Sequence, residues 1–511
     1  MTLAAGPAAR RTITDVRRRW GAFIGGSWVT PGGPTFSVLN PADGSVLAAV
    51  SDCGPEEVDA AVLAARGAQS GWASLSPRQR GAHLRAISAH LLDHADELAE
   101  LESLENGKPR RDARRFDVAY AVATFDYFAG IVETQHAAII DQGPIEAQIR
   151  HDPYGVVGAI LPFNWPPIHF AAKTAPALAA GNTIVVKPGE QAPLTVLRMV
   201  ELAAEILPPG VINAVPGMAA GIALSAHDGV GRLTFTGSPD TGRKVLAAAA
   251  ANLTPCTMEL GGKNALIVFP DADIDVTLAA AIEGMYFNQG EACTATTRLL
   301  VHDDIYDEFA RRFAAATESL VVGVGTDPET EVGPLVDRRQ QERVISYIDI
   351  AQAEGAVLLA QAAIPTDPLL QGGFWVAPTL FGEVTADMRI AQEEVFGPVA
   401  TLMRFNSESE ALAIANGTEY GLTAAVFTTD AERAARFADG LEAGMVFVNN
   451  YFRASLLGSP FGGIKSSGYG REGAAETLAE FVRSKNVRFP SGTSAIPEWG
   501  PARRLADATR P

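Results

Sequence analysis

The chain has 511 residues, of which 47% are hydrophobic and 20% are charged. This length and composition are typical of a globular protein that folds as two or three domains. The formal net charge of -18 argues against nucleic acids and anionic membranes as partners, because both bind to basic surfaces. Small-molecule chemistry is therefore the favoured class of function.

The cysteine content argues for a reducing compartment. Cys53, Cys256 and Cys293 are too few for a disulfide framework or a thiolate zinc site. We therefore expect a cytoplasmic protein without a metal. No apolar run reaches the length of a transmembrane span. The Arg-rich opening "AARRTITDVRRRW" is an alternative signal, for an organellar transit peptide, but it is short and contains Asp15.

Helical patterns come first along the chain, and short apolar runs follow. The helical spacing predicts helices over 55–72, over 77–107 as far as Gly107, and over 112–134. Four apolar runs then each precede a helix-like segment, at 155–161, 183–187, 211–215 and 232–235. This alternation predicts an α/β fold with an open parallel sheet.

Residues that follow such strands are candidate ligand contacts, because ligands bind at the carboxyl ends of a parallel sheet. In "TGSPDTG", Gly237 and Gly242 match the outer glycines of a dinucleotide motif, but Pro239 replaces the middle one. The motif alone fits a plain strand-to-helix turn equally well. Glu190 in "KPGE" is placed to accept both hydroxyls of an adenosine ribose and to repel a 2'-phosphate, which favours NAD. Lys187 would attract that phosphate, so NADP stays open.

A second α/β pattern occupies the later half of the chain. Apolar runs alternate there with helical patterns at 303–319, 336–354 and 430–439, and the runs are 263–269, 298–302, 398–405, 423–429 and 444–450. The passage between the two halves lies near residue 260, and clefts between domains commonly hold pockets.

Three groups near that passage are candidates for one reaction centre. Cys293 supplies a nucleophile, Glu259 a carboxylate, and Asn164 an amide donor for an oxyanion. Each also has a structural alternative, since a lone Cys is often a small buried hydrophobe, the acid fits a helix cap, and Asn is a common turn residue.

Seven separated motifs occur in one order along the chain. They are "PFNWP" (162–166), "KPGEQAP" (187–193), "FTGS" (235–238), "MELGGK" (258–263), "NQGEACTATTR" (288–298), "EEVFGPV" (393–399) and "PFGGIKSSGYGRE" (460–472). The set resembles the NAD(P)-dependent aldehyde dehydrogenase superfamily over roughly residues 20–490. The resemblance implies a Rossmann-type cofactor domain, an α/β catalytic domain and a small β oligomerisation arm.

The resemblance also implies domain limits and a homodimer or homotetramer. The cofactor domain would comprise 1–135 and 153–258, the catalytic domain 259–455, and the arm 136–152 and 480–495. Residues 456–479 would return to the active-site cleft, and 496–511 would form a tail. Strands are expected within the arm at 146–152 and 480–489.

By the same resemblance, Cys293 attacks an aldehyde as a thiolate, and the Asn164 side chain and the Cys293 N–H hold the oxyanion. Glu259 then activates the water that hydrolyses the thioester. NAD is the implied cofactor, with Glu394 on the nicotinamide ribose and Phe396 beside it. The full set of implied cofactor contacts is Ile160, Pro162, Phe163, Lys187, Glu190, Gly221, Phe235, Gly237, Ser238, Leu260, Glu394 and Phe396.

The implied substrate pocket is mostly apolar, which suits a neutral aliphatic or aromatic aldehyde. Its residues would be Trp165, Ile168, His169, Ala292, Thr294, Leu456 and Phe461. Arg453 is the counter-candidate, as a clamp for the carboxylate of a semialdehyde, but we expect it at the surface because buried unpaired Arg is rare.

The sequence departs from the common pattern of the family in two places. Glu291 stands where Gln is common, and a carboxylate facing the thiol would raise the pKa of that thiol. Phe163 and Trp165 stand where the family commonly has Trp before and Phe after the Asn, so the larger and the smaller aromatic side chains are interchanged on the two sides of Asn164.

A CoA-acylating dehydrogenase and an inactive binding relative remain alternatives, although Glu259 favours hydrolysis and the retained Cys293 favours activity.

Overall fold

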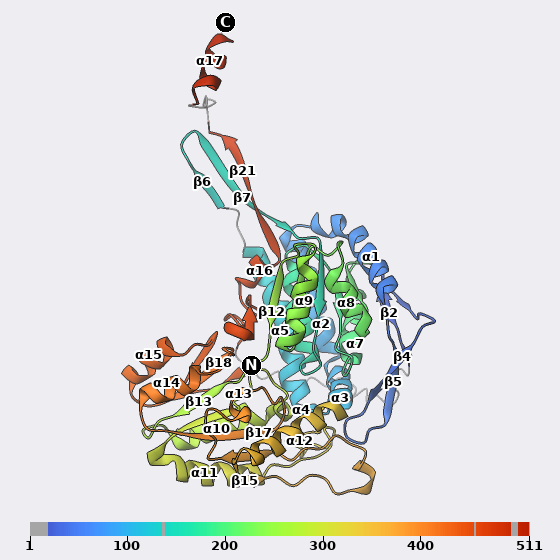
Figure 1. Cartoon of the computed structure of the whole chain (residues 1–511). Helices are drawn as coiled ribbons and strands as arrows, with labels where there is room; N and C mark the ends of the chain where they lie inside the picture. The colour runs from blue at the N-terminus through green and yellow to red at the C-terminus, as the bar shows by residue number, and fades with distance from the viewer. Residues whose placement is uncertain (1–18, 135–137, 454–455, 492–498, 510–511) are drawn as a thin grey trace.

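The computed structural model describes residues 19–134, 138–453, 456–491 and 499–509. Figure 1 shows two α/β bodies packed against each other and a narrow β arm that projects from one of them. The predicted α/β class is therefore observed. The Arg-rich opening considered above lies almost wholly outside the described residues.

The body that carries the arm is built on an eight-stranded sheet of order β20-β12-β11-β8-β9-β10-β2-β3. Its strands are β2 (Ala22–Ile24), β3 (Ser27–Val29), β8 (Val156–Ile160), β9 (Thr183–Lys187), β10 (Ile212–Ala214), β11 (Arg232–Thr236), β12 (Cys256–Glu259) and β20 (Gly468–Tyr469). Strands β8 to β11 are buried at every residue. Burial on both faces is why they appear in the sequence as uninterrupted apolar runs, and all four predicted runs are confirmed as strands.

The helices of this body correct one prediction. They are α1 (Pro55–Ala73), α2 (Pro77–Asp93), α3 (Ala95–Asn106), α4 (Arg110–Asp112), the π-helix η1 (Ala113–Val118), α5 (Ala119–Thr134), α6 (Pro166–Ala179), α7 (Leu194–Ala204), α8 (Met218–Ala226) and α9 (Pro239–Ala250). The single helix predicted over 77–107 is wrong. His94 leaves the helical region at φ -104° and ψ 13°, ending α2 and starting α3. Asp96 and Glu97 then favour a new helix start, because acids stabilise a helix N-terminus.

A small sheet of order β1-β5-β4 was not predicted, and its strands are β1 (Arg19–Trp20), β4 (Thr35–Leu39) and β5 (Val46–Ser51).

The other body is built on a seven-stranded sheet of order β15-β16-β17-β14-β13-β18-β19. Its strands are β13 (Ala265–Val268), β14 (Arg298–His302), β15 (Val357–Gln361), β16 (Thr379–Gly382), β17 (Val399–Phe405), β18 (Thr423–Phe427) and β19 (Met445–Val448). Its helices include α10 (Ile274–Tyr286), α11 (Asp303–Glu318), α12 (Arg338–Ala353), α13 (Arg389–Gln392), α14 (Glu408–Asn416) and α15 (Ala431–Gly440), with short 3-10 turns η2 (Phe287–Gly290), η3 (Pro368–Leu370) and η5 (Lys465–Ser467). The five predicted strands are confirmed, and β15 and β16 are additions.

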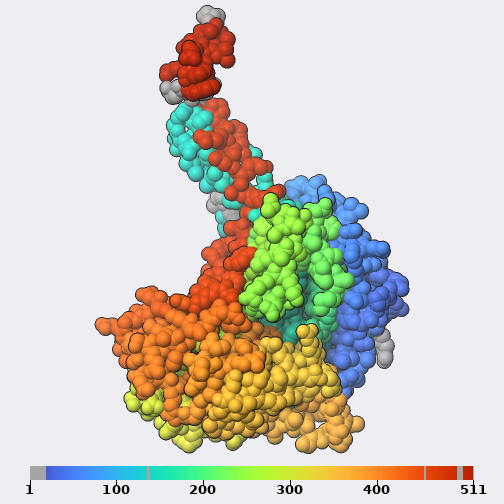
Figure 2. Space-filling view, viewed as in Figure 1, coloured from blue at the N-terminus to red at the C-terminus, as the bar shows by residue number. Residues whose placement is uncertain are grey.

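The arm is an antiparallel sheet of order β21-β7-β6, formed by β6 (Ala138–Asp141), β7 (Ile145–Pro153) and β21 (Val482–Pro490). Both predicted arm strands are confirmed, paired from Val482 with Pro153 to Pro490 with Ile145. Figure 2 shows the arm standing clear of both bodies, with α17 (Gly500–Ala508) at its far end. Helix α16 (Thr477–Glu480) precedes it. Within the described residues, no helix has the length and apolar character to cross a membrane.

Two glycines that end helices allow a matched test of packing. Gly107 follows α3 at φ 94°, and a Cβ on it would lie 2.7 Å from the carbonyl oxygen of Pro334. Gly355 follows α12 at φ 97°, and a Cβ there would meet nothing within 4 Å. Both positions require a left-handed backbone, but only the first also excludes a side chain.

We expect Gly355→Ala to cost about 1 kcal/mol of stability, because Ala is strained at positive φ. Gly107→Ala should cost roughly 1–3 kcal/mol more, because the new methyl group overlaps backbone. Thermal unfolding of both variants beside the parent protein measures the difference. Equal losses of Tm would contradict the packing argument.

Candidate active site

Three sequence-predicted groups lie where the two bodies meet. Asn164 follows β8, Glu259 ends β12, and Cys293 lies in the loop between η2 and β14. Asn164 is 3% exposed and Glu259 is 2% exposed, so both are shielded from bulk water. Asn164 and Glu259 thus lie at the carboxyl ends of parallel strands of one sheet, whereas Cys293 lies in the loop that enters β14 of the other sheet.

The Asn164 side chain is tied to the nucleophile loop. Its Nδ2 donates to the carbonyl oxygen of Glu291 at 3.0 Å, and its Oδ1 lies 3.3 Å from Nε2 of His169. Burial holds the pKa of His169 well below its usual range, so a neutral imidazole is free to donate to that oxygen. An amide nitrogen carries two hydrogens. One Nδ2 hydrogen therefore remains for a ligand.

A buried ion cluster holds the backbone of the same turn. Lys108 Nζ lies 2.7 Å from Asp117 Oδ1, 2.8 Å from Glu102 Oε1 and 2.9 Å from the carbonyl oxygen of Asn164. It also lies 4.3 Å from the ring centroid of Trp165. All three charged side chains are buried. Burial lowers the pKa of Lys108, but the two carboxylates outweigh it and raise that pKa overall. Nothing in the sequence had identified this cluster.

The loop before Cys293 has an unusual backbone. Asn288, Gln289 and Gly290 have φ of 56°, 57° and 70°, and non-glycine residues seldom adopt such values. A Cβ on Gly290 would lie 2.4 Å from the carbonyl oxygen of Gly397, which requires a glycine there. Asn288 Nδ2 donates to the carbonyl oxygens of Asn164 at 3.1 Å and Glu291 at 3.0 Å. Such strain persists only where the surroundings enforce it, as functional sites commonly do.

The other side of the loop is held by an amide. Asn264 Nδ2 donates to the carbonyl oxygens of Cys293 and Ala295, each at 2.8 Å, while its Oδ1 accepts from the Thr423 N–H at 3.0 Å. The loop that carries Cys293 is therefore fixed from both sides. Asn264 and Asn288 were missed from the sequence, where a lone Asn carries no distinguishing signal.

The thiol lies among acidic groups. Burial raises the pKa of Cys293 to about 12, with further contributions from Glu394 and Glu259, while Arg453 and the Cys293 N–H lower it. The free protein therefore holds a protonated thiol at neutral pH. Glu291 does not face it, because Glu291 Oε1 accepts from the Val336 N–H at 3.2 Å. Burial raises the pKa of Glu291 well above its usual range, so it is a neutral acid.

Glu259 is enclosed by the segment that returns from the second body. Strand β20 pairs with β12, placing Gly468 opposite Glu259. A Cβ on Gly462 would lie 2.7 Å from Glu259 Oε1, which explains a glycine in "PFGG". Burial, and then Glu472, raise the pKa of Glu259 well above its usual range, while Lys173 lowers it. In the described structure neither carboxylate oxygen has a hydrogen-bond partner.

Lys173 connects that acid to the returning segment. Its Nζ lies 2.5 Å from Glu472 Oε1 and 3.2 Å from Thr234 Oγ1. The side chain is fully buried. A buried cation beside Glu259 partly offsets the cost of ionising that carboxyl.

The predicted dinucleotide contacts gather at the ends of β8, β9 and β11. Lys187 and Glu190 form an ion pair, and a Cβ on Gly221 would pack 3.5 Å from Cε of Lys187. Ile160 is buried at the end of β8. Pro162 and Phe163 are half-buried, and a Cβ on the nearby Gly189 would lie 2.9 Å from the carbonyl carbon of Pro162.

The outer glycines of "TGSPDTG" have a packing role. A Cβ on Gly237 would lie 2.6 Å from Phe235 Cζ, and one on Gly242 would lie 2.8 Å from Leu260 Cδ2. Ser238 caps α9 by accepting from the Thr241 N–H at 3.3 Å. Pro239 is the first residue of α9, a position where proline is well tolerated. Pro239, which stands in place of the middle glycine of the motif, is therefore the start of a helix.

Glu394 and Phe396 lie beside the "LGGK" segment and the turn after β8. Glu394 Oε1 accepts from the Gly262 N–H at 3.0 Å, and a Cβ on Gly261 would lie 2.3 Å from Glu394 Oε2. Burial raises the pKa of Glu394 to about 7. Phe396 has φ 61°, and its ring centroid lies 5.8 Å from that of Phe163. No group of three His, Cys, Asp or Glu side chains fit to hold a metal occurs in the described regions.

The predicted substrate residues differ in their exposure. Trp165, His169, Ala292 and Thr294 are buried, and Ile168, Leu456 and Phe461 are half-buried. The expectation that Arg453 lies at the surface is wrong, because this residue is only 4% exposed. Its guanidinium carbon lies 5.3 Å from the ring centroid of Phe287 and 5.7 Å from that of Tyr451. Aromatic faces shield the cation where a carboxylate would normally be expected.

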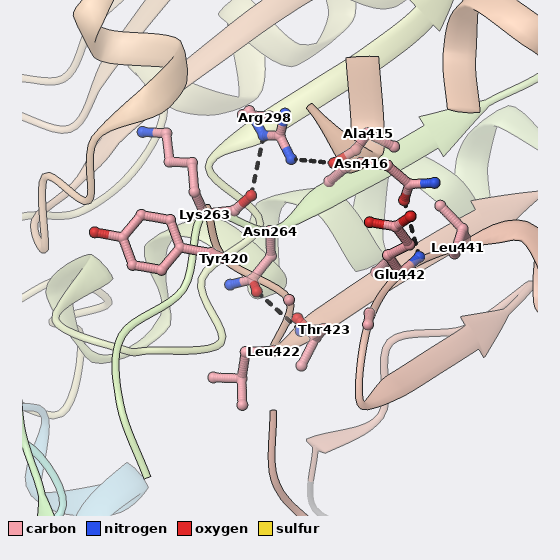
Figure 3. Close-up of a pocket in the computed structure, with 14 residues that line it drawn as sticks. Lys263, Asn264, Arg298, Ala415, Asn416, Tyr420, Leu422, Thr423, Leu441 and Glu442 are labelled. Carbon is pink, nitrogen blue, oxygen red and sulfur yellow. Dashed lines mark hydrogen bonds between the residues drawn. The ribbon is translucent and has the colours of Figure 1, made fainter. Parts of the chain in front are cut away.

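A separate pocket lies at the end of the seven-stranded sheet and contains none of the predicted site residues (Figure 3). Arg298 crosses it, donating to the carbonyl oxygens of Lys263 at 3.0 Å, Ile414 at 2.7 Å and Ala415 at 2.7 Å. Asn264 lines the same pocket. Arg298 and Asn264 support β14 and the loop that carries Cys293, whereas Nζ of Lys263, which also lines this pocket, has no hydrogen-bond partner in the described structure.

The acidic surroundings of Cys293 make its alkylation a test of the geometry. Because the thiol has a pKa of about 12, the iodoacetamide rate at Cys293 should rise about tenfold per pH unit between pH 7 and 9. Glu394→Gln should raise the rate at pH 9, because it removes a negative charge near the thiol. Peptide mass spectrometry measures the labelling.

Glu393→Gln is the matched control. Glu393 points to Arg389 and Tyr347, and its pKa is lowered chiefly by Arg389. Its removal should leave the Cys293 rate unchanged. Equal rates in the Glu393 and Glu394 variants would contradict the described surroundings of the thiol.

Comparison with known proteins agrees with this arrangement. The family model described as "Aldehyde dehydrogenase family" matches residues 28–487. The aldehyde dehydrogenase citD of Monascus ruber is 48% identical over 469 residues, covering 91% of this chain and 93% of that protein. An aldehyde dehydrogenase of Didymella fabae is 46% identical over 472 residues, covering 92% and 95%.

Among solved structures, PnpE from Pseudomonas sp. WBC-3 in complex with nicotinamide adenine dinucleotide superposes with a TM-score of 0.91 at 42% identity, covering 94% of this chain and 99% of that one. Betaine aldehyde dehydrogenase from Staphylococcus aureus, in complex with NAD+, superposes with a TM-score of 0.90 at 36% identity, covering 94% and 96%. The match spans nearly the full length of each of these four relatives, and the chain belongs to the aldehyde dehydrogenase family.

Proposed function

We propose that the protein oxidises an aldehyde to a carboxylic acid with NAD, through a thioester on Cys293. One observation carries the proposal. Asn164 Nδ2 donates to the carbonyl oxygen of Glu291 at 3.0 Å, two residues before the nucleophile, and keeps a second hydrogen free. The oxyanion donor and the thiol are thereby joined through one short loop.

The chemistry begins at the thiol. The Cys293 thiol gives up its proton to solvent, and Sγ then bonds to the aldehyde carbon while the π electrons of the C=O bond move to the oxygen, giving a thiohemiacetal oxyanion. The resulting oxyanion is held by the free Nδ2 hydrogen of Asn164 and by the Cys293 N–H. NAD, when bound, supplies the acceptor for the hydride that leaves this carbon. The Cys293 thioester then remains, and each oxyanion donor contributes about 3 kcal/mol to such steps.

Glu259 acts in the second half of the reaction. It takes a proton from the water that attacks the thioester carbon, and Cys293 leaves as the carboxylic acid forms. Burial raises the pKa of Glu259, so its carboxylate is a stronger base than that of a free Glu. Lys173 and Arg471 lower that pKa, which helps the acid to lose its proton again.

The strand ends suit a dinucleotide. The α9 N-terminus begins at Pro239 after the Ser238 cap, and helix N-termini favour a pyrophosphate. Thr236 Oγ1, buried just before it, has no partner in the described structure, so it is free for a ligand. Lys187 and Glu190 are already paired, which leaves Lys187 less available to a 2'-phosphate. These observations favour NAD over NADP.

We expect Glu190→Ser to raise the kcat/KM ratio of NADP to NAD by about tenfold or more, because it removes a negative charge and frees Lys187. Asp240→Asn is a control that removes an exposed acid near the same helix start. Initial rates with both cofactors measure the ratio. A ratio that Glu190→Ser leaves unaltered would reject the role of this residue.

The function itself is tested by NADH formation with a panel of aldehydes, with and without CoA. We expect turnover that does not need CoA, and its complete loss in Cys293→Ala. In Glu259→Gln, a burst of NADH should precede a slow steady rate, because loss of the Glu259 carboxylate slows thioester hydrolysis more than thioester formation. Dependence on CoA would favour the acylating alternative, and activity retained in Cys293→Ala would refute the proposal.

A further inference from the structure

Arg453 is a buried cation with an unused donor. It follows β19 and is 4% exposed. Its Nη2 donates to the carbonyl oxygen of Glu283 at 2.7 Å. Its Nη1 is buried and has no acceptor within the described residues. A buried guanidinium with a free donor is costly unless an acceptor arrives.

Three other buried cations have acceptors. Lys108 lies between two carboxylates and a carbonyl oxygen, and Lys173 contacts Glu472. Arg298 has no acid but donates through Nε, Nη1 and Nη2 to three carbonyl oxygens. Lys263 Nζ and Arg232 Nε, like Nη1 of Arg453, are buried without a hydrogen-bond partner in the described structure. Arg453 differs from these two in lying against the rings of Phe287 and Tyr451.

An aromatic wall connects Arg453 to the turn that carries Asn164. The ring of Trp165, the residue after Asn164, stacks on Phe287 with centroids 5.8 Å apart and an angle of 24°. Phe116 packs against both rings, at 5.2 Å and 5.3 Å. The guanidinium carbon of Arg453 then lies 5.3 Å from the Phe287 centroid. A cluster of aromatic rings, in which Trp165 and Phe287 are stacked, thus runs from the residue beside Asn164 to the cation.

The same cation is linked to the nucleophile. Tyr451, whose ring the guanidinium also faces, donates its hydroxyl to the carbonyl oxygen of Thr294, the residue after Cys293. The charge of Arg453 is close enough to lower the pKa of Cys293. Cys293, the aromatic wall and Arg453 therefore border one region.

We propose that Arg453 binds a carboxylate of the substrate, so that the enzyme acts on aldehydes that carry an acid group on a flat, apolar body. This inference rests on the proposed aldehyde oxidation. It replaces the expectation of a neutral substrate, which was based on the apolar pocket residues and set Arg453 aside as a surface residue. A carboxylate would accept the free Nη1 hydrogen and neutralise the buried charge.

Two isosteric substrates test the inference. We expect kcat/KM for 4-carboxybenzaldehyde to exceed that for 4-methylbenzaldehyde by about tenfold or more. Arg453→Met should lower this acid-to-neutral ratio by about 100-fold. The acid-to-neutral ratio for Arg453→Lys, which keeps the charge but loses the planar guanidinium, should lie between the ratios of the intact protein and Arg453→Met. Arg311→Met, at an exposed position on α11, should leave the ratio unchanged.

A binding measurement separates this inference from the proposed reaction. Calorimetry compares 4-carboxybenzamide with 4-methylbenzamide, which are not oxidised, on the intact protein and on Arg453→Met. We expect tighter binding of the acid, by about tenfold or more, in the intact protein alone. This binding measurement tests the inference even if no aldehyde is turned over. The comparison of the two amides on the intact protein tests it even if the variant fails to fold.

Several results would overturn the inference. One is an intact protein that prefers the neutral substrate or binds both amides equally. Another is a decrease of kcat/KM in Arg453→Met that is equal for both aldehydes, which would show that Arg453 stabilises the thiolate of Cys293 instead. Turnover of neutral aldehydes with either of these results would leave the proposed function standing and reject the inference alone.

Discussion

The buried charge of Lys108 is the constraint on which the rest of the site depends. It cannot return to water, and the acids Glu102 and Asp117 hold it where it meets the carbonyl oxygen of Asn164. The turn after β8 is thereby anchored to the helices before it. Removing one partner of such a cluster leaves an uncompensated buried charge, which is far more damaging than losing a surface ion pair. The Asn164 side chain then carries this anchoring across to the nucleophile loop.

The electrostatics around Cys293 follow from burial more than from charge pairing. Glu259, Glu291 and Glu394 all have raised pKa values, and burial is the largest cause for each. Each is oriented differently, toward the returning segment, the Val336 N–H and the Gly262 N–H. A resting site that is close to neutral suits a thiol that must wait for its substrate. Such groups, with shifted pKa values in a shielded region, are typical of catalytic sites.

The sequence predicted what depends on local pattern and missed what depends on distant partners. Strands β8 to β11 were recognised because burial on both faces makes them continuously apolar. The break at His94 was missed because helical spacing continues through it. Strands β4, β5 and β15 were missed because they are partly exposed and lack the continuous burial of β8 to β11. Lys108 was missed because a Lys with acids six and nine residues away fits a solvated helix surface equally well, and its link to Asn164 spans 56 residues. Arg453 was misplaced because its partner Glu283 lies 170 residues away along the chain. The order of the motifs predicted the family, which the comparisons confirm, whereas the side chains that support Asn164 and Cys293 appear only once the chain is folded.

The returning segment makes the site a late product of synthesis. Lys173 meets Glu472, which lies 299 residues further along the chain, and the carbonyl oxygen of Gly261 meets Ser467 across 206 residues. A nascent chain that has released the first body still lacks β20 and the groups that enclose Glu259. Contacts this distant in sequence close slowly, after local elements have formed. The ribosome must therefore deliver almost the whole polypeptide before Glu259 acquires its final surroundings, and an incomplete chain would carry the Cys293 thiol without the segment that encloses Glu259.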